Sequence, residues 1–153
     1  MPTVEDRLTE LGITLPEVAA PAANYVPFVR SGAMLYVSGQ VARDGNGPIL
    51  GRLGDGYGVA AGAAAARTCA VYLIAQVRTA CDGDLGRLVR VVKLTGFVNS
   101  APGFTEQSKV VNGASDLLVE VLGDRGRHAR SAVGVAALPF GVAVEVEGVF
   151  EVA

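Results

Sequence analysis

The longest apolar stretch of the chain, Val59–Ala80, is rich in alanine and predicts one long helix. Polar residues interrupt it, among them Arg67, Gln76 and Arg78, and they are too frequent for a segment that spans a bilayer. Asp82-Gly-Asp follows and ends the helix. The N-terminus is polar and lacks the apolar core of a signal peptide. We therefore expect a soluble protein that is not embedded in a membrane.

Shorter β-prone runs and a second helical segment surround this long helix. The expected elements are, in chain order, strands at Tyr25–Arg30 and Met34–Gln40, the helix at Val59–Ala80, a strand at Leu88–Val98, a helix at Phe104–Leu122, and strands at Ala129–Ala137 and Val142–Val152. This ββαβαββ order predicts an α+β fold, in which a single mixed β-sheet has two helices packed on one face.

The remaining segments predict a short helix and loops. Thr3 is placed to cap a helix at Val4–Leu11, and the glycine-rich segment Arg43–Gly58 predicts a loop. The chain has no repeat and no linker long enough to divide it. We therefore expect one domain over residues 1–153, with residues 1–20 as an N-terminal extension.

The apolar content exceeds what one core of this size needs. Hydrophobic residues make up 50% of the chain and charged residues only 18%, against about 25% charged in an ordinary soluble domain. In the last predicted strand, Glu145 and Glu147 share one parity, while Val144, Val146 and Phe150 share the other. The sheet face that the helices leave uncovered then needs a partner, and we expect an oligomer.

Charge and residue inventory exclude several classes of protein. The net charge of −2 and the single histidine argue against a nucleic-acid binder. No phosphate-binding glycine loop occurs, and a zinc site of the usual ligands cannot be assembled, so we expect no cofactor and no metal. Cys69 and Cys81 lie about 18 Å apart along one helix, too far for a disulfide. Reduced thiols favour a cytoplasmic location.

Arg130 is the best-placed candidate for chemistry. It lies in a predicted strand whose same-parity neighbours, Ala132 and Gly134, are small, so its guanidinium has space to bind a small carboxylate through two bonds. If the last two strands form a hairpin with an even loop, Arg130 and Glu145 point to the same face. The alternatives are a structural Arg–Glu pair and, for the basic cluster at residues 125–130, a solvated turn.

Several motifs resemble those of one known family. Ala129-Arg-Ser-Ala-Val-Gly-Val-Ala-Ala-Leu-Pro, followed by Val144-Glu-Val-Glu, resembles the C-terminal signature of the RidA family, the YjgF-type imine/enamine deaminases also known as L-PSP endoribonucleases. Pro21-Ala-Ala-Asn-Tyr and Leu35-Tyr-Val-Ser-Gly-Gln match the family's N-terminal segment, and Asn112 falls where the family keeps a helical asparagine. The resemblance implies a chorismate-mutase-like fold and a homotrimer with sites between subunits.

The resemblance also implies roles for individual residues. Arg130 would anchor a substrate carboxylate, Glu145 would orient or activate water, and Tyr25 would close the pocket and donate a hydrogen bond. The implied substrate-binding residues are Asn112, Ser38, Gly39 and Ala132. Typical members have a cysteine where this chain has Ala132, a change that alters the shape of the pocket more than its chemistry.

The implied activity is hydrolysis of small, reactive 2-imino or 2-enamino acids to 2-oxo acids and ammonia. Two alternatives remain at this point. A trimeric module that binds small carboxylates or 2-oxo acids without catalysis would use the same arginine. RNA cleavage, which the older family name suggests, is disfavoured by the net charge and the single histidine.

Overall fold

The computed structural model describes residues 1–18 and 24–153. The helices and strands are α1 (Val4–Glu10), β1 (Phe28–Ser31), β2 (Met34–Val41), β3 (Arg43–Asp44), β4 (Gly47–Pro48), α2 (Val59–Ala80), β5 (Leu88–Asn99), α3 (Gln107–Leu122), β6 (Ala129–Val135) and β7 (Val144–Val152). This order confirms the predicted ββαβαββ succession. The bounds of α2 agree with the prediction, whereas α3 begins at Gln107 and not at Phe104.

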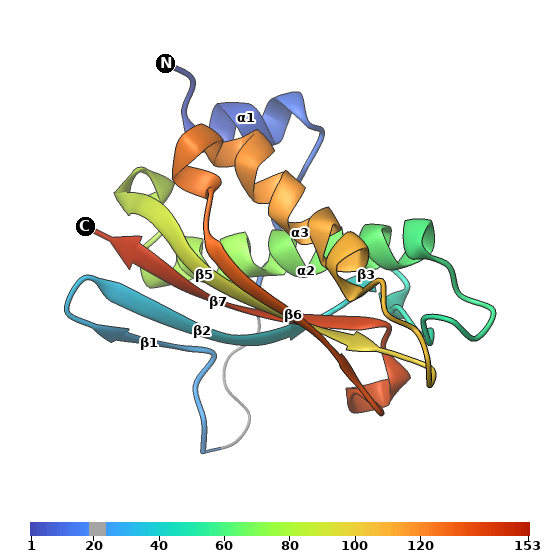
Figure 1. Ribbon diagram of the computed structural model, residues 1–153. Helices are drawn as coiled ribbons and strands as arrows, with labels where there is room; N and C mark the ends of the chain where they lie inside the picture. Colours follow the sequence, from blue (N-terminus) through green and yellow to red (C-terminus); the bar gives the residue numbers. More distant parts are fainter. Residues whose placement is uncertain (19–23) are drawn as a thin grey trace.

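Five strands form one mixed sheet in the order β1-β2-β7-β5-β6 (Figure 1). The pairs β1–β2, β2–β7 and β7–β5 are antiparallel, and only β5–β6 is parallel. Parallel neighbours need a crossover, which α3 supplies between β5 and β6. In this sheet β5, and not β6, lies beside the last strand.

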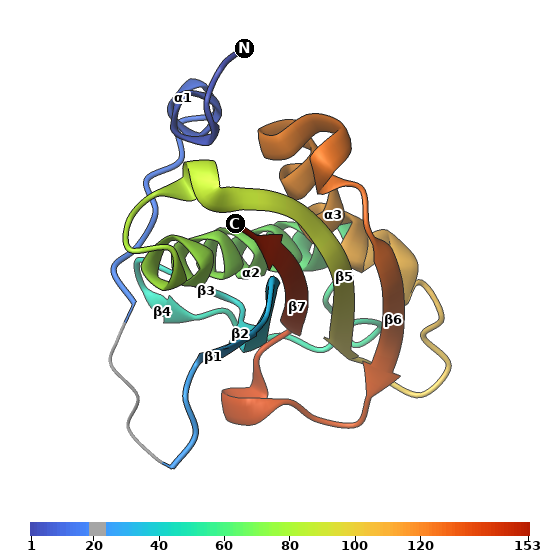
Figure 2. The same cartoon turned by 90° about the vertical axis from the view of Figure 1, so that its left-hand side faces the viewer.

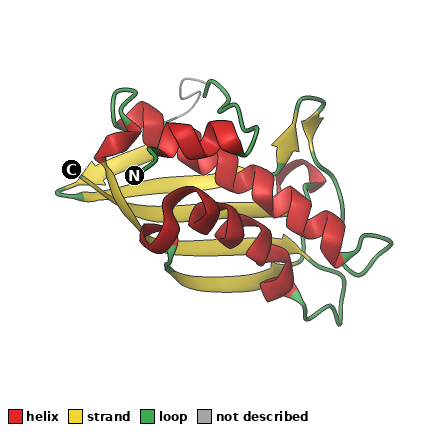
Figure 3. Ribbon diagram, turned by 90° about the horizontal axis from the view of Figure 1, so that it is seen from above, coloured by secondary structure: helices red, strands yellow, loops and turns green. Residues whose placement is uncertain are grey.

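The helices α2 and α3 cover one face of this sheet (Figure 3), and the opposite face is open (Figure 1). On α3 the buried residues recur every three or four positions, as an amphipathic helix requires. Leu73 and Ile74 of α2, Leu117 of α3, and Leu94 and Phe150 of the sheet lie in the shared core. The two-layer α+β architecture predicted from the sequence is confirmed.

By length and composition α2 is apolar enough to cross a membrane. The polar residues in this helix therefore do not exclude a membrane span, and the expectation that they do was wrong. Half of its most apolar window is nevertheless buried inside the fold, where it forms much of the core. Cys69 and Cys81 are free, buried thiols, in agreement with their predicted separation. Gly113 of α3 lies so close to α2 that an added Cβ would collide with the Ala63 carbonyl.

The segment 43–58, predicted only as a loop, contains the antiparallel pair β3–β4 (Figure 2). Asp44 Oδ1 accepts a hydrogen bond from the Asn46 amide at 2.8 Å, and Gly47 adopts a positive φ of 107°. An Asx turn followed by a left-handed glycine folds the chain back on itself. The loop prediction was therefore wrong at β3 and β4.

The short helix α1 begins as predicted, with a capping box at Thr3. Thr3 Oγ1 accepts from the Asp6 amide at 3.0 Å, and the Thr3 amide donates to Asp6 Oδ2 at 2.9 Å. Val4 and Leu8 are buried in the common core, where α1 packs against α3.

Candidate functional site

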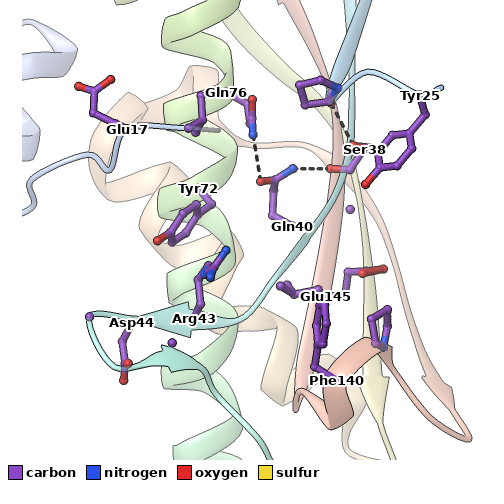
Figure 4. A pocket seen from close by; sticks show the side chains of 17 residues that line it. Glu17, Tyr25, Ser38, Gln40, Arg43, Asp44, Tyr72, Gln76, Phe140 and Glu145 are labelled. Atoms are coloured by element: carbon purple, nitrogen blue, oxygen red, sulfur yellow. Dashed lines mark hydrogen bonds between the residues drawn. The ribbon is translucent and has the colours of Figure 1, made fainter. Parts of the chain in front are cut away.

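The residues singled out from the sequence fall into two separate groups in the folded chain. The first group lines an open cleft of about 810 Å³ that follows the free edge of β2 (Figure 4). The edge is free because β1 pairs with β2 only as far as Val37. The cleft is lined by four predicted residues: Tyr25, Ser38, Gly39 and Glu145.

A β-bulge shapes this end of β2. Val37 pairs with Gly148 and Gln40 pairs with Val146, so two residues of β2, Ser38 and Gly39, stand opposite a single residue of β7. The backbone N–H and the hydroxyl of Ser38 both donate to the Pro27 carbonyl, at 2.9 and 3.1 Å. These bonds fix the bulge against the segment that leads into β1.

Gly39 is the residue that leaves room for the Glu145 side chain. A Cβ at this position would lie 2.8 Å from the carboxyl carbon of Glu145, closer than real Cβ contacts. The Glu145 carboxyl is half-buried, and burial raises its pKa above the ordinary value, as does the neighbouring charge of Glu147 to a smaller degree. A carboxylate with a raised pKa is a better general base near neutral pH.

The opposite wall of the cleft consists of residues that sequence reasoning missed. Gln76 Nε2 donates to Gln40 Oε1 at 3.3 Å, and Gln40 Nε2 donates to the Ser38 carbonyl at 2.9 Å (Figure 4). The Arg43 guanidinium lies over the ring of Tyr72, 5.8 Å from its centroid. The available signal was Gln76 itself, a polar residue on the buried face of an alanine-rich helix.

The second group lies at the other edge of the sheet, where β6 passes under α3. Arg130 Nη1 donates to Asn112 Oδ1 at 2.8 Å and to Ser115 Oγ at 3.1 Å, and Nη2 donates to the Ser108 carbonyl at 3.3 Å. Residues 108, 112 and 115 share one helix face because they are four and three positions apart. Ala132, two positions after Arg130, lies half-buried on the same side of β6.

These contacts leave two N–H groups of the Arg130 guanidinium without a partner among the described residues. Three of its five N–H groups donate to α3. The Nε–H and one Nη2–H have no acceptor within residues 1–18 and 24–153. Nε and Nη2 flank a single edge of the planar group, the arrangement that binds a carboxylate through two parallel charge-assisted bonds.

Arg130 and Glu145 do not point to the same face, so the sequence expectation on this point was wrong. Phe97 of β5 pairs with Val133 on one side and Glu145 on the other, which places Glu145 on the face of Val133 and away from that of Arg130. The expectation assumed that β6 and β7 are neighbours, whereas β5 separates them. A structural Arg130–Glu145 pair within one chain is excluded for the same reason.

Tyr25 is well exposed at the mouth of the cleft, in the bend before β1. The strand that was predicted to begin at Tyr25 begins at Phe28. Pro21, Ala22 and Ala23, the first residues of the motif that resembles the family's N-terminal segment, lie outside the described residues.

Known proteins resemble this chain over nearly its full length. A family model described as "YjgF/chorismate mutase-like, putative endoribonuclease" matches residues 5–149. Protein TCP17 of Trypanosoma cruzi is 56% identical over 150 residues, which are 97% of this chain and 93% of that protein.

Two crystal structures share both fold and sequence with the chain. Atu1372 of Agrobacterium tumefaciens, a protein described as having unknown function, is 49% identical with a TM-score of 0.91, over 99% of this chain and 94% of that one. A protein of Shewanella oneidensis described as a "putative endoribonuclease" is 37% identical with a TM-score of 0.93, over 99% of this chain and 100% of that one.

Proposed function

The chain belongs to the YjgF/chorismate mutase-like family, which includes RidA, and we propose that it hydrolyses small 2-imino or 2-enamino acids to 2-oxo acids and ammonia. The observation that carries this proposal is the guanidinium of Arg130, which α3 holds through three hydrogen bonds and which keeps the N–H of Nε and one N–H of Nη2 for a substrate carboxylate. The half-buried Glu145 beside Gly39 supplies the matching base.

The reaction needs few groups. Arg130 binds the substrate carboxylate through its free edge. Glu145 accepts a proton from a water molecule as the water oxygen attacks the carbon of the protonated imine, which gives a neutral tetrahedral adduct with an amino and a hydroxyl group. Glu145 then returns this proton to the amino nitrogen and takes up the hydroxyl proton as the C–N bond breaks, so that ammonia leaves and the hydroxyl becomes the 2-oxo group. Such imines are already reactive, so positioning can provide most of the acceleration.

The separation of the two groups favours a site between subunits. Arg130 on β6 and the cleft on β2 are three strand intervals apart, about 14 Å, and Arg130 and Glu145 point to opposite faces of the sheet. A small imino acid cannot touch both within one chain. We therefore propose that the Arg130 group of one subunit lies against the Glu145 cleft of the next subunit. The assembly that we propose is a homotrimer, and its proposed location is the cytoplasm. The number of subunits comes from the resemblance to the RidA family.

A mixing experiment tests both the activity and the shared site. Arg130→Ala and Glu145→Gln, each purified alone, should lose turnover of an imine generated in situ. Co-expression of the two variants should restore about a quarter of the wild-type rate, because random assembly pairs an intact Arg130 with an intact Glu145 at that fraction of interfaces.

Mixed assemblies that remain inactive would place the site within one chain and overturn the shared arrangement. Wild-type protein that binds 2-oxobutyrate saturably but hydrolyses no imine would overturn the deaminase and support the binding module.

The pH profile of the reaction should respond to Glu147. Glu145 acts as a base only when it is deprotonated, so kcat/KM should fall as the pH drops through its raised pKa. Glu147→Gln removes one of the charges that raise this pKa, and the acidic limb should move to lower pH. Glu151→Gln, on the same strand face but absent from the causes of the Glu145 shift, is the control and should leave the limb in place. An acidic limb that stays fixed in Glu147→Gln would show that Glu145 is not the base.

A further inference from the structure

A chain of hydrogen bonds continues from Arg130 into the turn that joins α3 to β6. Ser115 Oγ, which accepts from Arg130 Nη1, lies 2.9 Å from His128 Nε2. His128 Nδ1 in turn lies 2.6 Å from the carbonyl oxygen of Gly126. None of Ser115, His128 and Gly126 appeared among the candidate residues, and His128 is the only histidine of the chain.

The chemistry of the partners fixes the direction of every bond. A carbonyl oxygen only accepts, so the ring proton of His128 must be on Nδ1. Burial lowers the pKa of His128 below its ordinary value, the hydrogen bond to Gly126 raises it in part, and the nearby charge of Arg130 lowers it again. Because the net shift is downward, the neutral form of the ring predominates at pH 7. Nε2 is then an acceptor, and the Ser115 hydroxyl donates to it. Ser115 keeps a lone pair that faces Arg130.

The far end of this chain rests on a rigid turn. Gly126 closes the 3-10 turn Gly123–Gly126, and a Cβ on Gly126 would collide with the Leu118 carbonyl of α3. The turn is therefore held tightly against the helix, and the carbonyl that accepts from His128 has a fixed place relative to α3. Through His128, the position of the Gly126 carbonyl therefore sets the orientation of the Ser115 hydroxyl.

We propose that Ser115 and His128 are positioning residues for Arg130: they hold Nη1 so that the Nε–Nη2 edge faces the substrate carboxylate. This inference rests on the proposed function, in which Arg130 is the carboxylate anchor. Nη1 has two N–H groups and two acceptors, Asn112 and Ser115, and loss of the Ser115 acceptor frees the guanidinium to rotate about its long side chain. Substrate affinity then falls, while the attack of water beside Glu145 is unaffected.

The kinetic test separates binding from chemistry. Ser115→Ala and His128→Leu should each raise KM for the imine, and Kd for 2-oxobutyrate, by about tenfold, with kcat within about twofold of wild type. His128→Gln places an amide oxygen near the position of Nε2 and should recover most of the affinity. Ser31→Ala, which removes a hydroxyl from β1 at the opposite edge of the sheet, is the matched control and should change neither constant.

A second readout does not depend on activity. With a single histidine, the imidazole nitrogens give one set of NMR signals, expected to show the neutral Nδ1–H form. Arg130→Ala should raise the pKa of His128, because it removes a cation that lowers it, and Ser115→Ala should shift the Nε2 resonance.

The two readouts separate the possible failures. A proton on Nε2 in the wild type, or unchanged KM in both Ser115→Ala and His128→Leu of an active enzyme, would overturn the positioning role. A wild type with the expected NMR signature but with neither imine turnover nor 2-oxobutyrate binding would overturn the proposed function of Arg130 and, with it, this role.

Discussion

Arg130→Ala should lower kcat/KM for 2-iminopropanoate by about a hundred- to a thousandfold, the largest catalytic effect expected from one substitution in this chain. The loss follows from the two charge-assisted bonds that the free guanidinium edge would make to the substrate carboxylate. Arg130→Lys should recover little, because an ammonium group is a point charge without a fork of parallel donors. Release of 2-oxo acid or ammonia from an imine generated in situ measures the effect.

Arg127 provides the matched control for this substitution. It lies in the same basic cluster, but its Nε donates to Asp124 at the surface, and its side chain makes no hydrogen bond to α3 in the part of the chain that the structure describes. Arg127→Ala should leave the rate unchanged. Equal losses in both variants would point to the overall charge of the cluster and against a specific anchor. Retention of full activity by Arg130→Ala would remove the basis of the proposed function.

Gly113→Ala should cause the largest loss of stability, about 3 kcal/mol or more of the free energy of unfolding. An added methyl group would enter the carbonyl of Ala63, which belongs to the backbone of α2 and cannot rotate away. The two helices would have to separate, and the contact between α2 and α3 is one of the most extensive in the fold. The midpoint of urea unfolding, followed by circular dichroism, measures the change.

Gly45→Ala makes the same chemical change in open space. No atom lies within 4 Å of a Cβ at Gly45, and its φ is outside the left-handed region. Its unfolding midpoint should stay close to that of the wild type, within about 0.5 kcal/mol. A midpoint for Gly113→Ala as high as that of Gly45→Ala would show that α2 and α3 can move apart at little cost.

Local patterns predicted the elements well but could not predict their neighbours. The alternation of Val144, Glu145 and Val146 gives the two faces of β7, and the periodicity of α3 gives its buried side. Whether β6 lies next to β7 depends on the crossover through α3, which strand parity does not encode. The prediction that Arg130 and Glu145 share one face of the sheet was wrong for this reason, although both residues had been named as site candidates.

The hydrogen-bond acceptors of Arg130 also show that local sequence patterns do not predict which residues meet in space. Asn112 was identified through its resemblance to a family position, and Ser115 was missed although it lies one helical turn further along α3. The sequence placed His128 only within the basic cluster at residues 125–130. Its contact with Ser115 joins residues 13 positions apart, and only the path of the chain through the turn at Gly126 brings them together.

The bulge in β2 changes which residues of that strand face the helices and which face outward. Val37 faces the helices, and an unbroken strand would turn Gln40 outward and Val41 inward. The additional residue reverses this order, so that Gln40 reaches Gln76 of α2 while Val41 pairs with Glu145 on the outer side. Removal of a single residue from Ser38-Gly39 would abolish the bulge but keep the two faces, because Gln40 would then follow Val37 by two positions and still point to the helices, with Val41 outward. The two faces of β2 beyond the bulge are therefore those of a strand one residue shorter, and what the additional residue changes is the local backbone at Gly39, where the Glu145 side chain approaches.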